Sequence, residues 1–115
     1  MALIIENKLI FMVQGSACDP YKVTFQKVGS KLSAFCTCPA GENGQYCKHR
    51  FNILNGVSES IINEKYHESE ILKSWLTGTD VEVALNEVVI AEEEFEVAKR
   101  NLAAAKRELA KAFRK

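Results

Sequence analysis

The chain has 115 residues, which is enough for one domain with an appended element. Its 15 basic and 15 acidic residues cancel, which argues against a protein that coats nucleic acid nonspecifically. An apolar content of 47% is too high for a disordered chain, and no apolar run approaches the roughly 20 residues that span a bilayer.

The chain contains four cysteines, and their chemistry depends on the compartment. Its first residues, MALIIENK, contain neither a basic region nor a small-residue cleavage site, so we expect no secretory signal. In a chain without export features, cysteines are expected to bind metal rather than to form disulfides. We therefore expect a cytoplasmic protein that does not associate with a membrane.

Residues 1–56 have the pattern of a β-rich domain, because short apolar or alternating runs are separated by residues typical of turns. The clearest run is 21–26, where apolar and polar side chains alternate. A turn at 29–31 would join this strand to the next one in a hairpin. We expect strands at residues 3–5, 9–13, 21–26 and 32–35, a turn at 6–8, a loop at 41–44 and a short helix at 47–54.

Two pairs of potential metal ligands occupy the end of this domain: Cys36 with Cys38, and Cys47 with His49. Cys36 and Cys38 are two residues apart at the end of a predicted strand, so their side chains share a face. The second pair repeats that spacing where the helix is expected to begin. Three thiolates and one imidazole complete a tetrahedral zinc shell with no open position. We therefore expect one structural zinc ion per chain.

Two other arrangements of the cysteines explain the sequence less well. A disulfide between Cys36 and Cys47 would leave Cys38 and Cys18 to account for. Buried cysteines without metal would leave the spacing unexplained. Cys18 lies outside the pattern, and we expect a small buried or half-exposed side chain there rather than a redox-active thiol or a ligand.

The ligand pattern resembles that of the SWIM zinc finger, which is Cys-x-Cys, a variable loop and Cys-x-His. Members of that family often have Pro after the first pair and Lys between the last two ligands, as Pro39 and Lys48 do here. The Tyr-x-Val strand at residues 21–23 is also similar, and the resemblance extends over residues 9–55. It implies a β-hairpin followed by a helix, with zinc clamping the turn, and binding to DNA or to another protein.

Residues 57–78 are expected to form a connector of one or two short helices. One apolar set includes Ile61, Ile62 and Tyr66, and a second lies within residues 71–76. The two sets are out of phase on a helix, so we expect a break near residues 67–69. Gly78, which follows the second set, is typical of a helix end.

Residues 79–115 are expected to form one long helix, because Thr79 and Glu82 fit a capping box and neither Gly nor Pro follows. Apolar residues recur at alternating spacings of three and four, which is the pattern of a coiled-coil seam. One position of the seam is Ala in every heptad from residue 84, and the other is Val, Phe or Leu. The seam consists of Val81, Ala84, Val88, Ala91, Phe95, Ala98, Leu102, Ala105, Leu109 and Ala112.

Charge is divided along this helix. Residues 80–96 hold seven acidic residues, whereas residues 99–115 hold seven basic residues against Glu108 alone. An antiparallel partner would place acidic against basic halves, and Ala at alternate layers lets two helices approach closely. Compensation of the helix macrodipole accounts only for the end turns. We expect an antiparallel homodimer through residues 79–115, with packing onto residues 57–77 of the same chain or onto another protein as the alternatives.

Together these patterns predict an α+β protein. Its parts are a small zinc-stapled antiparallel β-hairpin or sheet with a short helix (residues 1–56), a helical connector (57–78) and a long coiled-coil-like helix (79–115). We find neither a Gly-rich phosphate loop nor a catalytic arrangement of side chains outside the zinc ligands, so we do not expect an enzyme.

Two functions fit this organisation. In the first, the finger recognises another protein and the long helix dimerises. In the second, the chain is an accessory DNA-binding protein. Residues 1–56 carry six basic and three acidic residues, which is a weak electrostatic footprint for nucleic acid, so we favour the protein partner. The possible contact residues for DNA or a protein partner are Lys48, Arg50, Lys22, Lys27 and Lys31.

Overall fold

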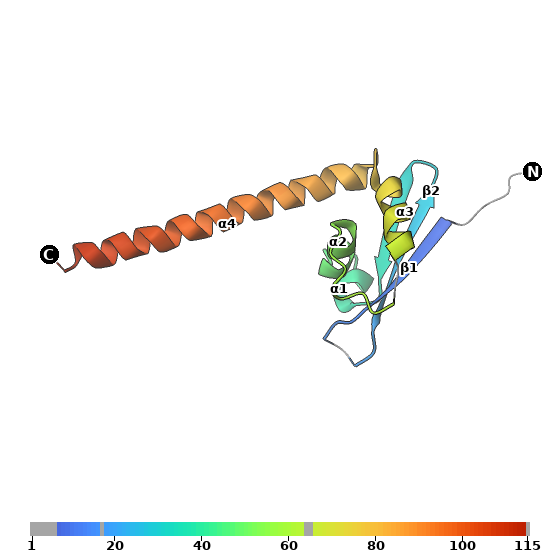
Figure 1. Ribbon diagram of the computed structural model, residues 1–115, viewed down its shortest axis with the longest axis horizontal. Helices are drawn as coiled ribbons and strands as arrows, with labels where there is room; N and C mark the ends of the chain where they lie inside the picture. Colours follow the sequence, from blue (N-terminus) through green and yellow to red (C-terminus); the bar gives the residue numbers. More distant parts are fainter. Residues whose placement is uncertain (1–6, 17, 64–65, 115) are drawn as a thin grey trace, which may run out of the picture. The chain divides into compact units, whose positions relative to one another are not determined.

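A computed structural model describes residues 7–16, 18–63 and 66–114. The chain divides into two compact units, Met1–Leu85 and Asn86–Lys115. A three-stranded sheet and three helices lie in the first unit, and a fourth helix begins there and continues through the second (Figure 1). In chain order the elements are β1 (Asn7–Val13), β2 (Tyr21–Val28), β3 (Lys31–Cys36), α1 (Pro39–Glu42), α2 (Lys48–Leu54), α3 (Tyr66–Leu76) and α4 (Asp80–Ala112). This is the α+β fold that the sequence predicts.

The sheet is an antiparallel meander in the order β1-β2-β3. The predicted hairpin is confirmed, since β2 and β3 pair from Val23 opposite Cys36 to Val28 opposite Lys31. A two-residue turn joins them, and its first residue, Gly29, has a φ of 59° that other residues rarely adopt. The turn expected at residues 6–8 is wrong for residues 7 and 8, because both belong to β1. The strand expected at residues 3–5 falls beyond the described ranges.

One face of the sheet forms the core of the first unit. Phe11, Val13, Val23 and Phe25 are almost completely buried, and the rings of Phe11 and Phe25 meet edge to face with centroids 5.7 Å apart. Ile53 of α2 and Leu72 of α3 belong to the same buried cluster. Burying one such side chain contributes about 1.5–3 kcal/mol, so these strands are held mainly by apolar packing.

Residues 60–63 cover the end of β1 rather than forming a helix. The Gln14 N–H donates to the Ser60 carbonyl (2.9 Å), and the Ile62 N–H donates to the Met12 carbonyl (2.9 Å). The Met12 N–H in turn donates to the side-chain oxygen of Asn63 (3.0 Å). The helix expected around residues 61 and 62 is therefore wrong, because this segment satisfies the exposed edge of the strand.

Helix α3 is continuous, so the break expected near residues 67–69 is also wrong. Ile61 and Ile62 lie before this helix and only Tyr66 of their apolar set belongs to it, so the expected difference in helical phase from Leu72 and Trp75 does not arise. The helix ends where Lys27 of β2 donates through Nζ to the Trp75 carbonyl (2.6 Å). A cation at a helix C-terminus is favourable because carbonyls there lack helical partners.

The start of α4 has the capping contacts that the sequence predicts. The Glu82 N–H donates to Thr79 Oγ1 (3.2 Å), and the Glu82 carboxylate accepts from the Gly78 N–H (3.0 Å). Leu85 is buried in the first unit, whereas residues 90–114 are exposed. Within the ranges given above, no helix combines the length and apolar character needed to cross a membrane.

Candidate metal centre

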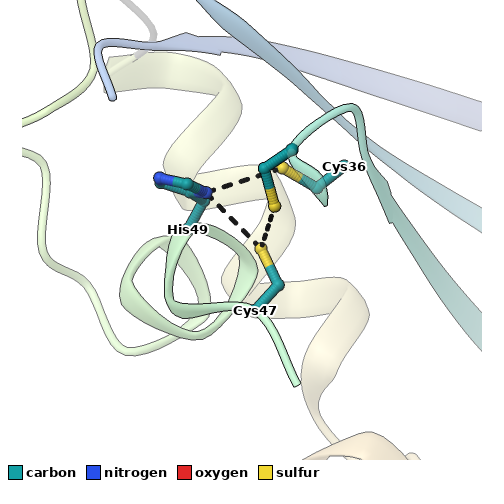
Figure 2. A group of neighbouring side chains, drawn as sticks. Cys36, Cys47 and His49 are labelled. Carbon is teal, nitrogen blue, oxygen red and sulfur yellow. Dashed lines mark hydrogen bonds between the residues drawn. The ribbon is translucent and has the colours of Figure 1, made fainter. Parts of the chain in front are cut away.

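Cys36, Cys38, Cys47 and His49 converge from the end of β3 and the starts of α1 and α2 (Figure 2). Their ligand atoms all lie within 4.8 Å of one another. The Cys38 and Cys47 sulfurs are 3.4 Å apart, and His49 Nδ1 lies 3.7 Å from the Cys36 sulfur and 3.6 Å from the Cys47 sulfur. The three cysteines are buried and His49 is half-buried.

The three distances between 3.4 and 3.7 Å are close to those of a zinc site. Bond lengths of about 2.3 Å to sulfur and about 2.0 Å to nitrogen in a tetrahedral shell place ligand atoms about 3.5–3.8 Å apart. Three thiolates and one imidazole are also ligands that zinc prefers, and together they leave no position for water or substrate. The four residues are therefore positioned to bind one structural zinc ion, as the sequence predicts.

The first ligand pair is held by continued pairing with β2. The Thr37 N–H donates to the Lys22 carbonyl (3.1 Å), and the Lys22 N–H donates to Thr37 Oγ1 (2.9 Å). Thr37 is exposed while Cys36 and Cys38 are buried, so the strand alternation extends past the end of β3. This alternation brings both sulfurs to the same side, as the two-residue spacing requires.

A short helix follows the first pair and extends into residues 41–44, where the sequence predicts a loop. Cys38 is the N-cap of α1, Pro39 occupies its first turn, and the Gly41 N–H donates to the Cys38 sulfur (3.3 Å). A Cβ atom at Gly41 would lie 2.5 Å from the Cys36 carbonyl oxygen, so the close approach requires glycine. The expectation is wrong for residues 41 and 42, because capping by Cys38 and the fixed φ of proline start a helical turn, whereas residues 43 and 44 lie outside the helix.

The second ligand pair begins α2, whose N-cap is Cys47. The helix ends at Leu54, as predicted for residues 47–54. The ring of Tyr21, at the start of β2, packs against the His49 ring with centroids 5.0 Å apart. This contact gives the Tyr-x-Val strand a physical role, because Tyr21 supports the imidazole that faces the sulfurs.

Arg50 joins three parts of the site. Its guanidinium donates to the carbonyl of Ala34 in β3 (3.1 Å) and to the carbonyl of Gln45 in the loop before Cys47. The sequence predicts Arg50 as a partner contact and does not indicate this role within the site. Nothing in its sequence position distinguishes the two roles, because the carbonyls come from other segments.

The other candidate contact residues are distributed over several surfaces. Lys27 donates to the end of α3, whereas Lys48 is exposed on α2. Lys22 and Lys31 are exposed on the face of the sheet opposite the core. Cys18 is exposed, so the expected buried or half-exposed side chain is wrong there, and it is not part of the cluster.

The surroundings shift the pKa values of three of the ligand side chains in different directions. Burial raises the pKa of the Cys36 thiol to about 12. Burial also opposes ionisation of Cys47, but the backbone amide of Arg50 and the neighbouring thiols outweigh it and lower the Cys47 pKa. Burial and then the charge of Lys48 lower the His49 pKa, so the imidazole stays neutral and can ligate. Zinc binding must therefore displace a proton from Cys36, and zinc affinity falls as pH is lowered.

Comparison with known proteins agrees with this geometry. Residues 21–50 match the model of the SWIM zinc finger family. Searches of curated proteins and of solved structures gave no match. The matched range contains β2, β3, α1 and all four ligand residues. The chain therefore carries a SWIM zinc finger at residues 21–50, with Cys36, Cys38, Cys47 and His49 placed to hold its zinc ion.

Proposed function

We propose that this chain is a non-enzymatic adaptor, in which the zinc finger domain binds another protein and α4 pairs antiparallel with a second copy. The SWIM finger is a binding domain, and its four protein ligands leave the metal no position for a substrate. Zinc therefore organises a surface rather than a reaction.

The placement of the basic side chains carries the preference for a protein partner. Of the five candidate contact residues, Lys27 and Arg50 donate to backbone carbonyls of the chain itself. Lys48 lies on α2, whereas Lys22 and Lys31 lie on the face of the sheet opposite the core. Binding to the phosphate backbone depends on several cations acting together, and of these five residues only Lys22 and Lys31 share a face, so the arrangement favours protein over DNA.

The alternative function, accessory binding to DNA, rests on the exposed lysines. DNA binding at about 150 mM salt by the zinc-loaded chain tests it, with Lys22→Ala/Lys48→Ala as the variant. We expect weak binding to duplex and single-stranded DNA that disappears near this salt concentration. Submicromolar binding that the double substitution abolishes would instead establish the DNA-binding function.

The proposed dimer is supported by the exposed seam and the divided charge of α4. Phe95, Leu102 and Leu109 are each more than half exposed. In an antiparallel pair each of these large side chains faces an Ala of the partner, whereas a parallel pair would place large against large and Ala against Ala. The antiparallel arrangement also places the acidic half of one helix against the basic half of the other.

Sedimentation and a label distance test this pairing. The wild-type chain should sediment as a dimer, and Ala105→Glu should shift it to monomer because the seam has no room for a charged side chain. Spin labels at Glu87→Cys in a Cys18→Ser background should lie about 27 Å apart along an antiparallel pair, at about 1.5 Å per residue from the middle of α4. Separations near 10 Å would show parallel helices, and a monomer at high concentration would refute dimerisation.

A further inference from the structure

The sheet has one face packed against the core and a second, exposed face. Side chains alternate between the two faces along each strand, as their burial shows. We call the second face the open face. Its described residues are Lys8, Ile10 and Met12 of β1, Lys22, Thr24, Gln26 and Val28 of β2, and Lys31, Ser33 and Phe35 of β3.

A row of side chains crosses the middle of the open face. Ile10 pairs with Thr24, and Thr24 pairs with Phe35. Ile10 is 37% exposed and Phe35 is 58% exposed, so both edges of the row present apolar surface. With strands about 4.8 Å apart, the two apolar side chains stand about 10 Å from each other. This spacing suits a partner that inserts apolar side chains on either side of Thr24.

The described residues of the open face carry charge of a single sign. Lys8, Lys22 and Lys31 are exposed and come from three different strands. None of the described residues that make up this face is acidic, although the chain as a whole is neutral. Lys22 is in the row next to Thr24, where it pairs with Met12. A partner with carboxylates near its apolar side chains therefore complements this face.

A second apolar surface in the first unit has no excess of charge of one sign. It is a groove of about 450 Å³ between α2 and α3, lined in part by Ile53, Leu72 and Leu76. The charged residues at its edge, Glu70 and Lys73, lie 3.3 Å apart as an ion pair. Their charges cancel, so the groove has no preference for the charge of a partner.

We infer that the open face binds an acidic protein segment with apolar side chains, an inference that rests on the proposed protein-recognition function. Protein is favoured over nucleic acid because three of the four apolar side chains are not aromatic. Only Phe35 can stack on a base, whereas Ile10, Met12 and Val28 complement aliphatic side chains.

A titration of the zinc-loaded, isotope-labelled full chain tests this inference. The probes are a synthetic peptide rich in Glu and Leu, a charge-reversed peptide with Lys at each Glu position, and an oligothymidylate. We expect the acidic peptide to shift amide resonances of the open face, centred on Ile10, Thr24 and Phe35. The charge-reversed peptide should leave these resonances unchanged.

Two substitutions with matched controls sharpen the test. Lys22→Glu should weaken binding of the acidic peptide about fivefold or more, because it places like charges together. Lys73→Glu makes the same change in net charge beside the groove and should leave the affinity unchanged. Phe35→Ser should also weaken binding about fivefold, whereas Phe113→Ser should not. All four side chains are exposed, so native amide dispersion should persist.

The contrary results are distinct from one another. The acidic peptide could instead shift amide resonances around the groove and lose affinity in Lys73→Glu but not in Lys22→Glu. That result would show that the open face is not the binding site, but it would leave the proposed protein recognition intact. Tighter binding of oligothymidylate than of the acidic peptide at about 150 mM salt, lost in Lys22→Glu, would overturn both proposals. The absence of shifts at the open face with the acidic peptide would overturn the inference itself.

Discussion

The strands β1 and β2 and the ligand region, residues 36–54, are held by different interactions. Phe11 and Phe25 lie on the strands among side chains that are almost wholly buried, and no described strand residue before Cys36 belongs to the metal cluster. In the ligand region, none of the α1 residues is buried, and α2 buries only Ile53. The other buried side chains of the ligand region are Cys36, Cys38 and Cys47.

This contrast shows where the metal is needed. A segment with so few buried apolar side chains cannot offset the conformational entropy lost when it becomes ordered. A structural zinc ion supplies that free energy, because its binding is coupled to folding of the ligands around it. The strands need no such contribution. Four substitutions test the contrast, in order of decreasing expected effect.

Loss of a ligand should have the largest effect. Cys38→Ser, or removal of zinc with a chelator, should abolish the native amide resonances of residues 36–54, because the metal holds them together. The resonances of β1, β2 and α4 should persist. Cys18→Ser is the control, since Cys18 is exposed outside the cluster. Native dispersion of residues 36–54 in metal-free protein would show that packing alone holds this region.

Truncation of a core ring should come next. Phe25→Ala should lower the free energy of unfolding by about 3–5 kcal/mol in zinc-loaded protein, because it leaves a cavity beside Phe11. Denaturant unfolding with zinc in excess measures this cost. Phe113→Ala, at an exposed position of the C-terminal segment, should change stability by less than about 0.5 kcal/mol. Equal effects of the two substitutions would contradict the core described here.

A smaller change should weaken the metal centre alone. Gly41→Ala forces its Cβ atom toward the Cys36 carbonyl and should lower zinc affinity about tenfold, which is about 1.4 kcal/mol. Competition with a chromophoric chelator measures the affinity. Gly78→Ala is the matched control, because Gly78 lies outside residues 36–54 and has a φ of 82° but no atom within 4 Å of an added Cβ. This control should lower the free energy of unfolding without changing zinc affinity. Equal losses of zinc affinity in the two variants would show that the close approach of Gly41 to Cys36 does not matter for the metal centre.

The smallest effect is expected at Arg50. Arg50→Met keeps much of the side chain's volume but removes the donors to the Ala34 and Gln45 carbonyls. The cost should be about 1 kcal/mol in thermal or denaturant unfolding, because these carbonyls can be hydrated once the guanidinium is gone. Lys48→Met, at an exposed neighbour, should cost less. The reverse order would show that Arg50 does not join β3 to the ligand loop.

The features predicted from the sequence are those with short-range patterns. The ligand spacing, the alternation along β2 and the capping contact of Thr79 with Glu82 depend on residues near one another in the chain. Two of the features that were missed depend on distant segments. The amide of Met12 meets Asn63, 51 residues away, and Arg50 reaches Ala34, 16 residues away. No local pattern encodes such pairings, so the edge contact of β1 and the role of Arg50 could be seen only in the structure.

X-ray absorption at the zinc edge on natively purified protein is the sharpest test of the zinc centre. One zinc ion per chain should be present, with three sulfur neighbours at about 2.3 Å and one nitrogen at about 2.0 Å. Fewer than three sulfurs, an oxygen from water in the shell, or protein that contains no zinc would contradict the assignment of Cys36, Cys38, Cys47 and His49 as the complete ligand set.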